Sequence, residues 1–349
     1  MTAIRPRDLL SDDLLGRLGG TAPQAGGQPG VRSADLAALA EAGYLNVALP
    51  AEFGGLGCTL RQAACGQRRL ARSAPGAALA VSAHLYWTGA AADAYRAGDD
   101  SMRWVLAEAA DGALFAAGHG GDAGGPGGDL RFADPGSRCE PARDGGYQFA
   151  QPGLVSTMTP GWDWIAVHGV HQAAPSRPGQ SQPAQPELVI GFAGRGARCT
   201  PAFRVARAQA AGAPGDVFLT SALTWGHAIL ASVQYSDARR AFNDALTAYA
   251  EAAAAAMFAA DGPAAPAPPA PPAGHWPVAE AGTLLDAMKS HIADITHRWP
   301  LVQPPTPDLG GQHLISLYAM RHRVADGAAR VHDLITQVTG APAPTRPLV

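Results

Sequence analysis

The sequence predicts a mainly helical α+β protein in which two helical regions flank a central β region. Three observations support this prediction. Apolar residues recur at helical spacing up to about residue 110, the spacing disappears between about residues 111 and 220, and it returns from residue 221 onward. We therefore divide the chain into an N-terminal helical domain (1–110), a central β domain (111–220) and a C-terminal helical bundle (221–349).

The first region contains several predicted helices. Leucines recur at three- and four-residue intervals between Leu9 and Leu18 and form one apolar face. Ser11 can cap this helix, because its hydroxyl accepts hydrogen bonds from first-turn amides. A second helix starts at Ser33 and ends at Gly43. Further helices are expected over Leu60–Arg72, Gly76–Thr88 and Ser101–Ala110.

The central region has short segments typical of β-strands. Strands are expected over Gly146–Ala150, Trp164–Gly169 and Glu187–Ala193, where β-branched and aromatic residues gather. Asp144-Gly145-Gly146 is a favourable turn sequence. The Pro-, Ser- and Gln-rich stretch 172–186 indicates a loop. We interpret this region as a small β-barrel or sandwich.

The last region returns to helix but is interrupted by proline. One long helix is expected over Trp225–Ala260. Residues 262–274, GPAAPAPPAPPAG, cannot be helical because proline lacks the amide donor, so they form a linker. Two more helices are expected over Val278–Trp299 and Gly311–Gly340. Their apolar faces favour a homodimer or homotetramer.

Composition excludes several classes of function. A formal net charge of −3 gives no electrostatic basis for binding nucleic acid. No apolar segment has the length of a signal peptide core or a membrane span. The four cysteines, Cys58, Cys65, Cys139 and Cys199, show no metal-like spacing and fit reduced thiols. We expect a soluble cytoplasmic protein that acts on a small molecule.

One motif gives the chain a family resemblance. Residues 50–57 read Pro-Ala-Glu-Phe-Gly-Gly-Leu-Gly and lie between predicted helices. This segment resembles the N-terminal domain of the acyl-CoA dehydrogenase family, in which a Pro-x-x-Tyr/Phe-Gly-Gly-x-Gly turn joins two helices. Residues 144–169 resemble the second domain of that family, and residues 235–242 resemble its first bundle helix. The resemblance implies the helix–β–helix fold, a flavin, and oxidation of an acyl thioester such as an acyl-CoA.

The resemblance also implies which residues bind the cofactor, expected to be FAD, with FMN or no flavin as alternatives. Gly128 and Asp129 match the end of the family's flavin-binding loop, within a Gly-rich stretch. Ser156 and Thr157 lie near the position of its flavin-contacting hydroxyl. Gln337 and Gly340 resemble the start of its Gln-x-x-Gly-Gly loop.

The catalytic base is the least defined part of this prediction. The family places a glutamate early in the first bundle helix or after the penultimate helix. The early position corresponds to Gly226, which His227 follows, and the other lies beyond Val349. Imidazole titrates near neutral pH, so His227 is the candidate base. An ordinary helix histidine with a structural partner is the alternative interpretation.

Two other functions remain open. The Thr-Glu pair of the flavin loop and an Arg-x-x-Phe-Gly element of the family are not recognisable, which fits a non-catalytic paralogue that serves as a binding or assembly module. A flavin-dependent monooxygenase of the same superfamily needs no α-proton base. No metal site is predicted, because the three-residue spacing of His168 and His171 on a strand puts their rings on opposite faces.

Overall fold

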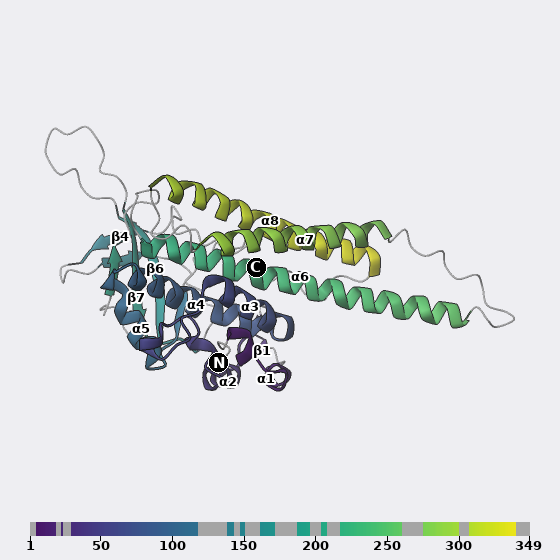
Figure 1. Ribbon diagram of the computed structural model, residues 1–349, viewed down its shortest axis with the longest axis horizontal. Coiled ribbons are helices and arrows are strands. Elements are labelled where there is room, and N and C mark those ends of the chain that lie inside the picture. The colour runs from purple at the N-terminus through teal and green to yellow at the C-terminus, as the bar shows by residue number, and fades with distance from the viewer. Residues whose placement is uncertain are drawn as a thin grey trace.

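Two helical layers and a small sheet make up the structure (Figure 1). The computed structural model describes residues 5–18, 22–23, 29–117, 138–142, 147–150, 161–171, 187–195, 204–207, 217–259, 275–299 and 307–339. The order of elements is helices, then strands, then three long helices, which confirms the predicted architecture. Across these residues, no helix is both long enough and apolar enough to cross a membrane.

The N-terminal layer consists of five α-helices and four short 3-10 turns. The helices are α1 (Asp12–Arg17), α2 (Ser33–Glu41), α3 (Leu60–Ser73), α4 (Pro75–Arg96) and α5 (Arg103–Ala110). The 3-10 turns are η1 (Pro6–Leu9), η2 (Tyr44–Asn46), η3 (Ala51–Phe53) and η4 (Asp100–Met102). The two-residue strands β1 (Ala22–Pro23) and β2 (Pro29–Gly30) pair antiparallel.

Helix boundaries follow local sequence signals. The Ser11 hydroxyl accepts from the amide of Leu14 at 3.2 Å, so the predicted cap of α1 is confirmed. Gly43 adopts a left-handed φ of 73° just after α2. The α4 helix runs eight residues beyond the predicted end at Thr88. Every residue from Gly76 to Ala94 is buried, so α4 is the central helix of this layer.

The Pro50–Gly57 turn shows why its glycines are spaced as they are. Gly54 and Gly57 have left-handed φ angles of 78° and 58°, which favour glycine. Gly55 has another reason. A Cβ at this position would lie 2.2 Å from the carbonyl oxygen of Leu49 and 2.4 Å from that of Asn46. The chain therefore packs directly against its own backbone here, so no side chain fits at position 55.

The β region forms a six-stranded sheet. Its strands are β3 (Phe115–Ala117), β4 (Arg138–Pro141), β5 (Tyr147–Ala150), β6 (Trp164–His171), β7 (Glu187–Gly194) and β8 (Arg204–Arg207). They are ordered β5-β4-β6-β7-β8, and β3 also pairs with β6. The β3–β6 and β4–β6 pairs are parallel and the others antiparallel. The predicted strands correspond to β5, β6 and β7. The predicted turn 144–146 and loop 172–186 lie outside the described residues.

The C-terminal bundle consists of three long helices, α6 (Val217–Ala259), α7 (His275–Arg298) and α8 (Pro307–Thr339). In Figure 1, α7 and α8 run alongside α6, and α6 extends past them at the end away from the sheet. The α6 helix starts at Val217, eight residues before the predicted start at Trp225. Linker 262–274 falls outside the described residues. The main apolar core of the described residues includes side chains from all three regions, and Cys139, Tyr147 and Val189 form a smaller cluster in the sheet.

Candidate functional site

The structure places two of the seven predicted site residues and keeps them apart. Gly128, Asp129, Ser156, Thr157 and Gly340 lie outside the described residues. Of the other two, His227 is buried on α6, whereas Gln337 is exposed near the end of α8. Tyr318 of α8 contacts His227, and the 19 residues from Tyr318 to Gln337 span about 28 Å of helix.

His227 lies beneath a partly exposed tyrosine. Only 1% of its surface is exposed, and its ring meets the ring of Tyr318 edge to face at 5.1 Å. Tyr318 itself is 47% exposed. The segment of α6 from Val217 to Ser236 contains no aspartate or glutamate. The part of α6 nearest the sheet therefore offers an imidazole but no carboxylate.

A buried aspartate of α4, Asp93, binds side chains of the bundle. Asp93 accepts hydrogen bonds from the indole Nε1 of Trp225 at 2.7 Å and of Trp299 at 2.9 Å, both on Oδ2. Arg96 donates to its other oxygen at 2.9 Å. Gly89, one turn earlier on α4, lets Trp225 approach, because a Cβ there would lie 2.3 Å from the indole. Three donors satisfy this carboxylate, as a buried charge requires.

His313 extends this polar group onto α8. The Thr224 hydroxyl donates to the carbonyl of Thr220 at 2.7 Å, so it accepts from Nε2–H of His313 at 2.9 Å. The His313 ring also packs against Trp299, with centroids 4.9 Å apart. Burial, and then the charge of Arg298, lower the pKa of His313 to about 4. His313 is therefore neutral at physiological pH.

More polar pairs occur further along the α6–α8 contact. Gln234 of α6 accepts a hydrogen bond from buried Arg321 of α8. One turn further, Asp237 pairs with Arg240 at 2.8 Å and lies 3.6 Å from Nε2 of His332. Burial raises the pKa of Asp237, but hydrogen bonds and charges from His332 and Arg240 outweigh it and leave the pKa below its usual value. Asp237 is thus held as a carboxylate.

Another buried histidine, His84, lies where the helices meet the sheet. Nδ1 of His84 on α4 faces the amide N–H of Phe115 at 3.3 Å. Since an amide can only donate, Nδ1 is the unprotonated nitrogen and Nε2–H donates to the carbonyl of Leu45 at 3.0 Å. Burial lowers the pKa of His84 to about 4, although the hydrogen bond to Leu45 and the charge of Asp163 oppose this. His84 therefore bridges η2, α4 and β3 in its neutral form.

Aromatic rings fill the space between the sheet and the helices. Trp87 meets Phe192 edge to face at 5.1 Å and stacks on Phe218 of α6 at 6.0 Å. Trp104 packs against Trp164 and Phe192 at 5.2 and 5.4 Å. Edge-to-face pairs of this kind contribute beyond their buried area. They fix the sheet against α4, α5 and α6.

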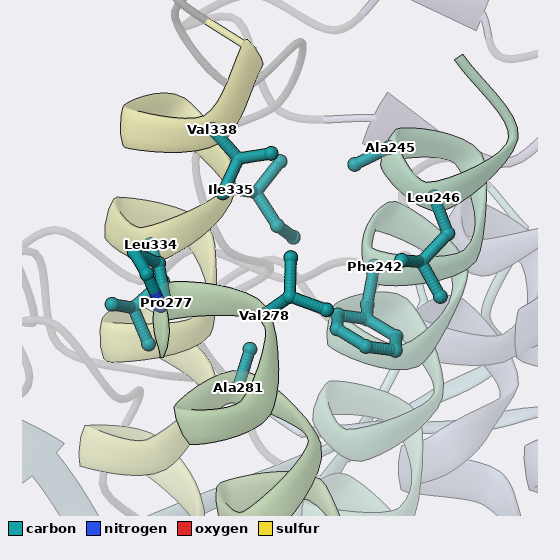
Figure 2. A pocket seen from close by; sticks show the side chains of 9 residues that line it. All are labelled: Phe242, Ala245, Leu246, Pro277, Val278, Ala281, Leu334, Ile335 and Val338. Carbon is teal, nitrogen blue, oxygen red and sulfur yellow. The ribbon is translucent and has the colours of Figure 1, made fainter. Parts of the chain in front are cut away.

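An apolar groove lies at the other end of the bundle (Figure 2). Its lining comes from α6 (Phe242, Ala245, Leu246), α7 (Pro277, Val278, Ala281) and α8 (Leu334, Ile335, Val338). Phe242 lies 15 residues beyond His227, about 22 Å along α6. Among the described residues, no polar side chain lines the groove to orient a substrate, so we do not assign chemistry to it.

The structure also shows which residues the sequence analysis missed. It did not single out Asp93, His84 or His313. The sequence did carry a signal for the first two. Within the small and apolar stretch 76–94, Asp93 is the only aspartate and His84 is the only histidine. An ionisable residue inside a helix buried on all sides needs specific partners. The described residues contain no group of three His, Cys, Asp or Glu side chains that could hold a metal ion.

Comparison with known proteins decides the fold family. Residues 24–129 match the family model of the acyl-CoA dehydrogenase N-terminal domain. This range contains the Pro50–Gly57 turn and helices α2 to α5. The chain has the acyl-CoA dehydrogenase fold. The predicted resemblance is thereby confirmed. No curated protein matches the sequence of this acyl-CoA dehydrogenase-like chain.

Solved structures with the acyl-CoA dehydrogenase fold resemble the whole chain at low identity. KijD3 in complex with dTDP is 18% identical, with 97% of this chain and 87% of KijD3 covered, at a TM-score of 0.71. A nitrososynthase from Micromonospora carbonacea var. africana is 18% identical, with 96% and 86% covered, at 0.66. The dibenzothiophene monooxygenase TdsC from Paenibacillus sp. A11-2 is 14% identical, with 89% and 81% covered, at 0.57. KijD3 and TdsC were also solved with FMN.

Proposed function

We propose that this chain is a flavin-dependent monooxygenase that transfers oxygen to a small organic molecule. The observation that carries the proposal is the absence of any carboxylate in residues 217–236, together with the burial of His227 under Tyr318. Removal of an α-proton needs a base at the substrate. Oxygen transfer has no such requirement. The names of the similar nitrososynthase and monooxygenase support the same choice.

We propose FMN or FAD as the cofactor, which in its reduced form would supply the two electrons that activate dioxygen. Gly128, Asp129, Ser156 and Thr157 would contact its ring system. This assignment comes from the family resemblance, because these four residues lie outside the described ranges. Gln337 and Gly340 would hold the adenine end if the flavin is FAD.

Oxidation of an acyl thioester such as an acyl-CoA is the second candidate, favoured by the position of His227. This residue follows Gly226, the predicted counterpart of one of the family's base positions, and the ring of half-exposed Tyr318 separates it from the surface. On this proposal, rotation of Tyr318 gives His227 access to the substrate. His227→Gln would then lower acyl-CoA turnover by about 10²- to 10⁴-fold, the usual contribution of a general base.

Flavin binding and product analysis distinguish these candidates. The purified protein is titrated with FMN and FAD, and binding is followed by quenching of flavin fluorescence. It is then given reduced flavin and oxygen with indole, dibenzothiophene or a nucleotide-linked amino sugar, and separately given acyl-CoA thioesters with an electron-accepting dye.

We expect flavin binding and a product about 16 mass units heavier than its substrate, the mass of one added oxygen atom. Dye reduction with an acyl-CoA and no oxygenated product would instead establish the dehydrogenase. A protein that binds neither flavin would leave the non-catalytic module as the function. The homodimer or homotetramer and the cytoplasmic location stay predictions, the first to be measured by analytical ultracentrifugation.

A further inference from the structure

We propose that this chain forms a two-fold dimer in which the end of α6 in each copy packs into the apolar groove of the other. The projecting end of α6 comprises residues 247–259. The groove is the one whose lining includes Phe242, Val278 and Ile335 (Figure 2). This assembly is independent of the proposed function, because it requires neither a flavin nor a substrate.

The α6 helix continues well past the other two helices of the bundle (Figure 1). The α7 helix begins two residues before Pro277, and α8 ends one residue after Val338, both of which line the groove. The α6 helix instead runs on from Leu246, its last groove-lining residue, to Ala259. These additional residues correspond to about 20 Å of helix. Helices α7 and α8 therefore do not run beside the projecting end.

The projecting end nevertheless has the composition of a buried helix. Residues 247–259 read TAYAEAAAAAMFA and include a single charged residue, Glu251. A helix with apolar residues on all sides is normally buried, and a short alanine-rich helix is marginal in water without packing. Every side chain from Leu246 to Glu251 is exposed or half-exposed, and so is Ala254. The projecting end therefore needs a packing partner outside its own bundle.

Apolar surface that can receive such a helix lies at the base of the projecting end. Across the groove, apolar side chains of α6 face those of α7 and α8 (Figure 2). Leu246 in its lining is 36% exposed. Trp276 directly precedes the lining residue Pro277 and is 78% exposed, more than any other large apolar side chain that the structure describes. An exposed tryptophan beside an apolar groove is typical of a protein interaction site.

A second copy is the occupant because one surface carries both the projecting helix and the groove that can receive it. When two projecting ends pack antiparallel about a two-fold axis, the tip of each lies beside the base of the other, where the groove begins. Such a contact uses the same surface on both copies and closes after two. One side of a 20 Å helix and the groove contribute about 300 Å² each. Trp276 adds about 200 Å², which brings the area near the roughly 800 Å² per partner of a stable dimer.

Sedimentation velocity of the full chain over a range of protein concentrations tests this interface. Trp276→Ser removes the exposed ring, and Ala250→Glu puts a charge one turn beyond Leu246 on the same side of α6. Both positions are exposed, so circular dichroism should show an unchanged fold. We expect each variant to raise the dimer dissociation constant at least about tenfold. Ile315→Ser is the matched control, because Ile315 is 72% exposed near the start of α8 and should leave the constant unchanged.

The same variants decide the question if the parent is a larger oligomer. In a tetramer, Trp276→Ser and Ala250→Glu should each halve the mass. A monomeric parent, or an oligomer that either variant leaves unchanged, would overturn the proposed interface, and the groove would then be covered by the chain's own residues or by another protein. An equal effect of Ile315→Ser would also overturn it, because the loss of assembly would not be specific to this surface.

Discussion

Gly89 is a glycine because the indole of Trp225 occupies the space of a side chain. The ring carbons would lie 2.3–2.6 Å from a Cβ at this position. This close approach brings the Trp225 Nε1 within 2.7 Å of Asp93. One missing methyl group on α4 thus allows the buried Asp93–Trp225 hydrogen bond.

We expect Gly89→Ala to lower the free energy of unfolding by about 1–3 kcal/mol, because it overpacks the α4–α6 contact. Urea denaturation followed by tryptophan fluorescence measures this. Gly282→Ala is the matched control, since Gly282 also lies within a helix and has nothing within 4 Å of a Cβ. It should raise the free energy of unfolding by up to about 1 kcal/mol. Equal losses in both variants would contradict this explanation.

Some contacts of single residues could not be predicted from the sequence. The glycines of the Pro50–Gly57 turn were recognisable as a pattern, but the contact of Gly55 with the Leu49 carbonyl appears only in three dimensions. Asp93 meets Trp225 and Trp299 across 132 and 206 residues. Helical periodicity compares neighbours three or four positions apart, so it carries no information on such pairs.

At the scale of elements, the contact between α6 and α8 is held by polar pairs as well as apolar side chains. Thr224 with His313, Gln234 with Arg321, and Asp237 with His332 follow one another along the two helices. Each pair has one partner on each helix. A one-turn slip of α8 would leave several buried polar groups without partners, so these pairs fix its register.

We expect Thr224→Val to lower the free energy of unfolding by about 1–3 kcal/mol, because it leaves the buried Nε2–H of His313 without its acceptor. The double variant Thr224→Val/His313→Leu removes both polar groups and should be more stable than the sum of the single effects predicts. Chemical denaturation of the parent, both single variants and the double variant gives the coupling energy. Additive effects would show that this bond does not contribute to stability.

Elements differed in how well the sequence predicted them. The helices were predicted because leucine and alanine repeat with helical spacing over many residues. The strands β3, β4 and β8 were missed, since each has only three or four residues and none shows clear alternation. The α4 helix was ended too early at Thr88, because the small residues beyond it carry little periodic signal although they are buried.

At the scale of the molecule, one core connects helices and sheet, and the candidate site depends on contacts between regions. The sequence led to the fold through a local turn motif, and residues 24–129 match the family model. It named His227, next to the expected position of a base, as the candidate but could not show that Tyr318, 91 residues later, covers it. Site geometry depends on such tertiary contacts, which no motif encodes.

Acid should destabilise the whole molecule, because two of its buried histidines are neutral when folded. The pKa values of His84 and His313 are lowered from 6.5 to about 4, in both cases mainly by burial. Between these values the unfolded chain binds protons that the folded protein does not. Stability therefore falls as the pH drops from about 6.5 toward 4, and above 6.5 these two groups have no effect.

The loss is at most about 3 kcal/mol for fully buried His84, since one pKa unit corresponds to about 1.4 kcal/mol. Urea denaturation at several pH values between 7 and 4.5 measures it. His313→Leu and His84→Gln should each be less stable at pH 7 but lose less stability on acidification than the parent. If both variants showed the same pH dependence as the parent, other groups would account for the acid sensitivity, and the neutral histidines would not control it.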